Sequence, residues 1–372
     1  MPNIGTMSLA RESRRFLLAA GLAMLATGLV AAWLGLGLGG AKTTLWVDDL
    51  ATPLAALTAC VLCFRAWARH EGRMRAFWAL LGCATVCWTL AEVIWGVYAL
   101  ILVEQVPVPS WADVGYLAAI PLAVAALVVH PATAGSRTRR ARSVFDGLVV
   151  ATALLFLSWT LVLGPLWRST DLSTWSGVVA LAYPFGDVVI VFFIVLAIRG
   201  MTGGGRLSLW CLLAGLLVMA LSDSTYTYLT EVATYTSKSG NLIDAGWVAA
   251  YLGIALAALS SPTPTAEAPR PELARPSLHS LLSPLLPVLL ALIVTALEIE
   301  LGHRLDTTDV LIACALIALV LARQGLLLRE LLAPGLRTGA GLRTRLKHTA
   351  LGGVVVDEGP GPNHRASGHG SI

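Results

Sequence analysis

The sequence predicts an all-α polytopic membrane protein with about ten transmembrane helices. Of its 372 residues, 56% are apolar and only 13% are charged, whereas soluble domains have about 25% charged residues. A membrane-spanning helix needs about 20 predominantly apolar residues. Stretches of this kind lie at residues 16–38, 48–67, 76–101, 111–130, 144–166, 175–198, 207–229, 242–260, 278–300 and 308–331. They leave no room for a soluble domain of ordinary size.

The distribution of basic residues predicts the orientation. Of the 26 Lys and Arg residues, 22 fall in the alternate segments that are cytoplasmic if the N-terminus is inside. This is the bias expected from the positive-inside rule. We therefore expect a multi-pass protein of a bacterial inner (plasma) membrane, with both termini cytoplasmic and the lipid bilayer around it. The net charge of +4 is explained by this topology and gives no reason to expect nucleic acid as a partner.

The segments follow one another in a simple order. Residues 1–15 form a short basic cytoplasmic start, and residues 16–334 form the transmembrane domain. The first span, 16–38, is longer than the roughly 7 to 15 residues of a signal-peptide core, so we expect it to be retained. The Pro-rich segment 261–276 is expected to be extended. Gly and Arg dominate residues 335–372, which predicts a disordered cytoplasmic tail.

A short motif occurs twice, which predicts an internal repeat. Asp113-Val114-Gly115-Tyr116-Leu117-Ala118-Ala119 recurs 131 residues later as Asp244-Ala245-Gly246-Trp247-Val248-Ala249-Ala250. The same offset relates Arg75 to Arg206 and Glu92 to Asp223. The copies span about 75–130 and 206–260, and each is a pair of helices. The two copies are an even number of helices apart, so they have the same orientation in the membrane. The repeat is therefore parallel, with a pseudo-axis along the membrane normal.

Five acidic residues are the main candidates for a ligand-binding or ion-binding site. Glu92, Asp187 and Asp223 lie within predicted spans, where a carboxylate is costly unless it is bonded or faces water. No Lys or Arg lies at their depth to neutralise them. Asp113 and Asp244 open their helices on the outer side, where Tyr and Trp residues accompany the acids. The hypothesis is an outward-facing pocket for a proton, a metal cation or an organic cation.

Two structural explanations compete with this hypothesis. Asp113 follows Ser110 by three residues, and Asp244 follows Asn241 by three, which is the spacing of a helix-capping box and favours a capping role. Cys60, Cys63, Cys83 and Cys87 could bind a soft metal. Cysteine is also an ordinary small apolar residue of membrane interiors, so we expect no metal site and no cofactor. No nucleophile with a base and no phosphate-binding loop is apparent, so we expect no catalytic residues and no enzyme.

Several of these segments resemble a known family. The segments at 113–122, 182–187 and 244–251 resemble the multi-spanning N-terminal membrane region of actinobacterial GGDEF and EAL proteins, which make or degrade cyclic di-GMP. Residues 321–332 resemble the helix that leads into their catalytic domains, and the likeness extends over about 75–335. The sequence contains no Gly-Gly-Asp/Glu-Glu-Phe and no Glu-Ala-Leu. The resemblance thus implies a sensor region without its catalytic domains.

The leading functional prediction is a non-enzymatic sensory or signalling module. We expect a cytoplasmic signalling partner, and self-association into a homo-oligomer is left open. Two alternatives remain at this point: a secondary transporter that uses the intramembrane carboxylates as a proton or cation relay, and a non-catalytic remnant of a membrane-anchored cyclic di-GMP enzyme. The ligand cannot be named from the sequence.

Overall fold

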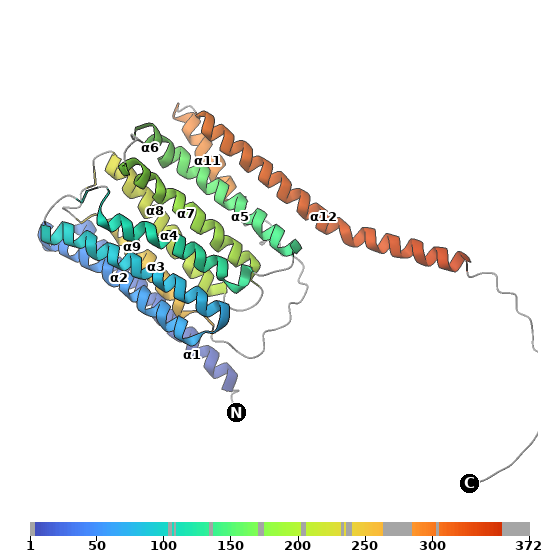
Figure 1. Cartoon of the computed structure of the whole chain (residues 1–372), viewed down its shortest axis with the longest axis horizontal. Helices are drawn as coiled ribbons and strands as arrows, with labels where there is room; N and C mark the ends of the chain where they lie inside the picture. The colour runs from blue at the N-terminus through green and yellow to red at the C-terminus, as the bar shows by residue number, and fades with distance from the viewer. Residues whose placement is uncertain are drawn as a thin grey trace, which may run out of the picture. The chain divides into compact units, whose positions relative to one another are not determined.

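The protein is all-α. The computed structural model describes residues 4–102, 106–107, 109–133, 137–169, 175–201, 206–231, 234–235, 240–262, 285–302 and 305–351 (Figure 1). Within these ranges the secondary structure is helical and contains no β-strand. The predicted fold class is therefore confirmed.

Eight helices in the described part of the chain are long and apolar enough to cross a membrane. They match eight predicted spans: α1 (Ile4–Leu36), α2 (Ala41–Arg69), α3 (Gly72–Gly96) with the π-helix η1 (Val97–Leu102), α4 (Trp111–Val129), α5 (Arg137–Ser158), α7 (Trp175–Gly200), α8 (Arg206–Glu231) and α12 (Thr307–Leu351). The other two predicted spans correspond to the shorter helices α9 (Asp244–Leu259) and α11 (Leu286–Glu300). The short helices η2 (Pro131–Thr133), η3 (Trp159–Leu163) and α6 (Gly164–Ser169) connect longer ones.

The outer surfaces of these helices are apolar, as a lipid environment requires. On α1 five leucines are each more than half exposed, namely Leu17, Leu18, Leu22, Leu25 and Leu29. Soluble proteins rarely expose contiguous apolar surface of this extent. Together with the lengths of the helices, this surface supports a membrane-embedded protein.

The chain divides into two compact units, Met1–Arg323 and Gln324–Ile372. In the second unit the helix runs to Leu351, past residue 335, where the sequence predicts the start of a disordered tail. This segment is rich in Leu and Arg, which are good helix formers. Residues 352–372 of the predicted tail, and 263–284 with most of the Pro-rich segment, lie outside the described residues.

Six helices of the first unit form a closed ring. Going round it, α2 packs on α3, α3 on α4, α4 on α7, α7 on α8, α8 on α9, and α9 back on α2. Outside the ring, α1 lies against α9 and α2, and α5 lies against α7 (Figure 1). In this ring α2 and α7 stand opposite each other, with two helices between them on either side.

Apolar side chains fill one end of the ring. The core there contains Phe77, Trp78 and Leu81 of α3, all almost fully buried. Alanines of the neighbouring helices pack around them and let the backbones approach closely: Ala59, Ala66, Ala126, Ala257 and Ala258. We call this the closed end of the ring.

Glycines allow the closest contacts between α3 and α4 and between α8 and α9. A Cβ on Gly115 of α4 would lie 2.9 Å from the Cβ of Ala91 on α3. A Cβ on Gly246 of α9 would lie 2.1 Å from Oγ of Ser222 on α8. Gly246 and Ser222 follow Gly115 and Ala91 by the same 131 residues. The two helix pairs therefore pack through corresponding positions.

Candidate functional site

A cavity of about 290 Å³ lies inside the ring and is lined by residues of all six helices. The lining comes from the first turns of α2, α4 and α9, the first half of α7, and the last turns of α3 and α8. These segments meet at the end opposite the closed end, which we call the cavity end. The volume is close to the lower limit of about 300 Å³ for small-molecule pockets.

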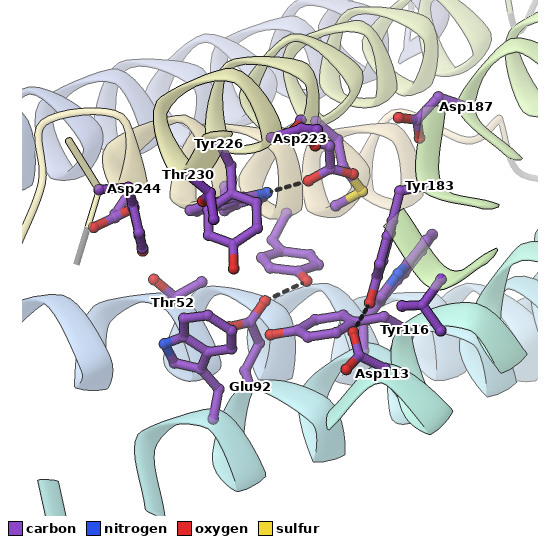
Figure 2. A pocket seen from close by; sticks show the side chains of 18 of the residues that line it. Thr52, Glu92, Asp113, Tyr116, Tyr183, Asp187, Asp223, Tyr226, Thr230 and Asp244 are labelled. Carbon is purple, nitrogen blue, oxygen red and sulfur yellow. Dashed lines mark hydrogen bonds between the residues drawn. The ribbon is translucent and has the colours of Figure 1, made fainter. Parts of the chain in front are cut away.

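The lining is strongly acidic. It includes seven carboxylates: Asp48, Asp49, Glu92, Asp113, Asp187, Asp223 and Asp244. No Lys, Arg or His is among the described residues that line the cavity. All five acids that the sequence singled out thus surround one space, and Figure 2 labels all five. Their role in binding remains a prediction.

Asp48 and Asp49 were not singled out by the sequence analysis. The predicted span begins at residue 48, which makes two acids there look like an ordinary helix end. The observed helix α2 begins earlier, at Ala41, so both carboxylates lie about two turns inside it. The sequence signal that could have identified them is the presence of two adjacent acids next to an apolar stretch.

Two of the acids accept hydrogen bonds from aromatic side chains of α9. The Tyr251 hydroxyl donates to Oε1 of Glu92 over 2.7 Å. The indole N–H of Trp247 donates to Oδ1 of Asp223 over 2.6 Å, and both bonds are drawn in Figure 2. Tyr116 of α4 also lines the cavity together with Glu92. The pairs Tyr116–Glu92 and Trp247–Asp223 occupy positions 131 residues apart, so each helix pair contributes one acid and one aromatic residue to the lining at corresponding positions.

Asp113 has a structural role as well as a place in the lining. Its Oδ2 accepts the backbone N–H of Ser110 over 2.6 Å, and Oγ of Ser110 accepts from the backbone N–H of Ala112 over 3.2 Å. These bonds form the capping box that the sequence predicts at the start of α4. The hydroxyl of Tyr183 on α7 donates to the other oxygen, Oδ1 (Figure 2).

Asp244 at the start of α9 behaves in the same way. Its Oδ2 accepts the backbone N–H of Asn241 over 2.9 Å, and its Oδ1 accepts the hydroxyl of Tyr235 over 3.2 Å. Asp48 of α2 lies near Asp244. The capping interpretation therefore agrees with the structure at Asp113. At α9 the residue before the helix is Ile243 and no side-chain cap bond is present, so only the bond from the Asn241 backbone to Asp244 matches the predicted box. Both acids also line the cavity.

Asp49 and Asp187 differ from the other five acids. Oδ2 of each is buried and has no hydrogen-bond partner among the described residues. Asp187 lies on α7 one turn after Pro184, which interrupts the backbone hydrogen bonds of the helix. Both residues line the cavity, and α2 and α7 are opposite each other in the ring.

Aromatic rings fill the space between the acids. Tyr226 of α8 packs edge-on against Trp95, Tyr235 and Trp247, with ring centroids 6.0, 4.7 and 5.9 Å apart. On the side of α4 and α7, Tyr116 packs against Tyr183 with centroids 6.3 Å apart. Aromatic faces attract cations, so this lining favours positive charge for a second reason besides the carboxylates.

A different charged site lies outside the ring, at the level of the closed end. Asp146 of α5 and Arg323 of α12 are both almost fully buried, and Nε of Arg323 lies 2.5 Å from Oδ1 of Asp146. Nε of Arg199, in the last turn of α7, lies 3.7 Å from the other oxygen. Arg199 and Arg323 are among the 22 basic residues that the sequence assigns to the cytoplasmic side. Their pairing with Asp146 was not predicted, because this partner is distant in the chain.

Within the described ranges, no group of three or more His, Cys, Asp or Glu side chains has an arrangement that could hold a metal ion. The six cysteines are free. Comparison with protein-family models, with curated proteins and with solved structures gives no significant match. The likeness to the membrane region of GGDEF and EAL proteins therefore stays a prediction.

Proposed function

We propose that the ring of six helices is the ligand-binding part of a membrane sensor and that it binds a small organic cation in its cavity. One observation carries the proposal: seven carboxylates and several aromatic rings surround the cavity, and its described lining has no Lys, Arg or His. Such a surface attracts positive charge, and the low dielectric around it strengthens the attraction.

An organic cation fits this lining better than a metal ion. Divalent metals need several oxygen ligands within about 2.0 to 2.6 Å of one point, and the described acids form no such group. The acids are instead separated by rings such as Tyr226 and Trp247. An ammonium group with an apolar body matches both kinds of surface.

The orientation predicted by the basic residues gives the cavity a direction. If the segments rich in Arg are cytoplasmic, the cavity end faces away from the cytoplasm and the closed end faces it, with the Asp146–Arg323 pair at the same level. We further propose that α3–α4 and α8–α9 are parallel copies of one unit. The matched glycine contacts and the matched acid–aromatic pairs support that origin.

The proposed signal is a change in helix packing on binding. A cation between the acids draws together helices of the ring, which already pack closely through Gly115 and Gly246. Helix α7 connects the two ends, since it carries Asp187 at the cavity and Arg199 beside Asp146. A cytoplasmic partner would receive the change, and the protein itself needs no catalytic activity in this scheme.

A secondary transporter is the second candidate. The observation that favours it is Asp187, a buried acid with one unpartnered oxygen on a proline-containing helix. Intramembrane acids on interrupted helices are common in transport pathways.

Binding and flux, measured on the same protein, distinguish the two candidates. We expect the full chain in lipid nanodiscs to bind butylammonium by calorimetry, and Glu92→Gln to weaken that binding about tenfold. Glu300→Gln, an exposed acid on α11 outside the cavity, is the matched control and should bind normally. Butylammonium uptake into proteoliposomes that is lost in Asp187→Asn would identify a transporter. Absence of binding to the wild type would refute the cation site.

A further inference from the structure

The arrangement of the acids indicates how many positive charges the ligand carries. We propose that the cavity binds a cation with one ammonium group at each end of a short apolar chain, as in a diamine or polyamine. This inference rests on the proposed cation binding and narrows its ligand class. One ammonium group contacts Asp187 and Asp223, and the other contacts Asp49 and Asp244.

The two carboxylate oxygens without partners are the first reason. The described partners of Glu92, Asp113, Asp223 and Asp244 are neutral donors that already satisfy part of each carboxylate. Asp49 and Asp187 each keep one buried oxygen with no donor. A buried acceptor without a donor is costly, and these two lie on helices α2 and α7, on opposite sides of the ring. One small ammonium group cannot supply a donor to both.

The acids also divide into two groups. Asp187 lies near Asp223, whereas Asp48 and Asp49 lie near Asp244. Glu92 lies between the two groups, within range of both Asp223 and Asp244. In Figure 2, Asp187 and Asp244 lie at opposite ends of the site, and Tyr226 and Tyr183 lie between them. The cavity thus has two acidic ends.

Between these ends the lining is aromatic. Tyr226 with Trp95 and Trp247 lines one stretch, and Tyr116 with Tyr183 lines another. Methylene groups pack well against such rings, and a slender chain fits a cavity of about 290 Å³. The hydroxyls of Tyr183 and Tyr251 are already used by Asp113 and Glu92, so the middle of the cavity offers mostly ring surface to the ligand.

A chain-length series tests this inference on the full protein in nanodiscs. Diamines from 1,3-diaminopropane to 1,8-diaminooctane are compared by calorimetry with butylamine at one salt concentration. We expect one length to be optimal and to bind at least about tenfold more tightly than butylamine. Asp49→Asn and Asp187→Asn should each reduce diamine affinity to the level of butylamine.

The possible failures are distinct. If butylamine binds and no diamine binds more tightly, the two-ended ligand is wrong and the cation site stands. If neither butylamine nor any diamine binds, the proposed function fails as well. The length series on the wild type decides the inference even if a variant is poorly folded, and Glu300→Gln should follow the wild type throughout.

Discussion

Buried acids have opposite surroundings at the two levels of the molecule. Outside the ring, at the level of its closed end, one carboxylate, Asp146 of α5, lies between two guanidinium groups, those of Arg199 and Arg323. At the cavity end the printed side-chain donors to the seven acids are neutral, such as Tyr251 and Trp247, and the described lining contains no Lys, Arg or His. Asp146 thus has its own countercharges, whereas the described cavity lining provides none. This difference is the basis for proposing a cationic ligand at the cavity end.

The largest expected change in the free energy of unfolding comes from the buried Asp146–Arg323 ion pair. Asp146→Ala leaves Arg323, which is 1% exposed, without its carboxylate partner, and loss of one partner of a buried ion pair costs about 3 to 5 kcal/mol. Thermal or denaturant unfolding in detergent measures this. Replacing both members, as Asp146→Leu with Arg323→Met, should recover much of the loss. A single variant as stable as the wild type would mean that the pair does not hold the two helices together.

The second effect is a loss of stability in acid at the closed end. His130 at the end of α4 is buried against the ring of Phe77, and the backbone N–H of Ala132 donates to its Nδ1 over 3.1 Å. Burial, and then the nearby Arg73, lower the pKa of His130 to about 4. The unfolded chain, with a pKa near 6.5, therefore binds a proton more readily than the folded protein.

Stability should accordingly be full above pH 6.5 and fall as the pH drops towards 4. The contribution of His130 to this loss is about 3 kcal/mol at pH 4. Unfolding measured at several pH values, with His130→Gln as the comparison, isolates that contribution. If the variant and the wild type lose stability in parallel, His130 is not the group responsible.

The smallest expected change in the free energy of unfolding is at the cavity end, and it is a gain of stability instead of a loss. Asp187→Asn removes a buried carboxylate that has an unpartnered oxygen, so it should leave stability unchanged or raise it by about 1 kcal/mol, as often happens at functional sites. The melting temperature of the empty protein in detergent measures it. A clear loss of stability would show that Asp187 supports the fold, and the contrast between the two ends would then disappear.

Much of the fold could be predicted from the sequence because membrane spans have a strong local signal. Apolar stretches of about 20 residues locate the long helices, and the Asp113 and Asp244 motifs indicate where α4 and α9 begin. The helix ends were less accurate. The span containing Asp48 was predicted to begin there, yet α2 begins at Ala41, since its first turns contain polar residues that do not resemble a span.

The candidate site was partly predictable for a similar reason. A carboxylate inside an apolar stretch is visible in the sequence, and this identified Glu92, Asp187 and Asp223. Which acids face one another depends on how the helices close into a ring, and the sequence carries no local signal for that. The same limit explains Asp146 and Arg323, which are 177 residues apart and meet only when α5 and α12 pack together.

Four helices of the ring, α2, α4, α7 and α9, begin at the cavity end. The amino terminus of a helix carries about half a positive charge and the carboxyl terminus about half a negative charge. Because α3 and α8 end here, the helix termini together offset only roughly one of the seven carboxylates. Protons or mobile cations must neutralise the others whenever no ligand is bound. A cationic ligand therefore enters by displacing sodium ions or protons from the cavity. Its apparent affinity should fall as the salt concentration rises.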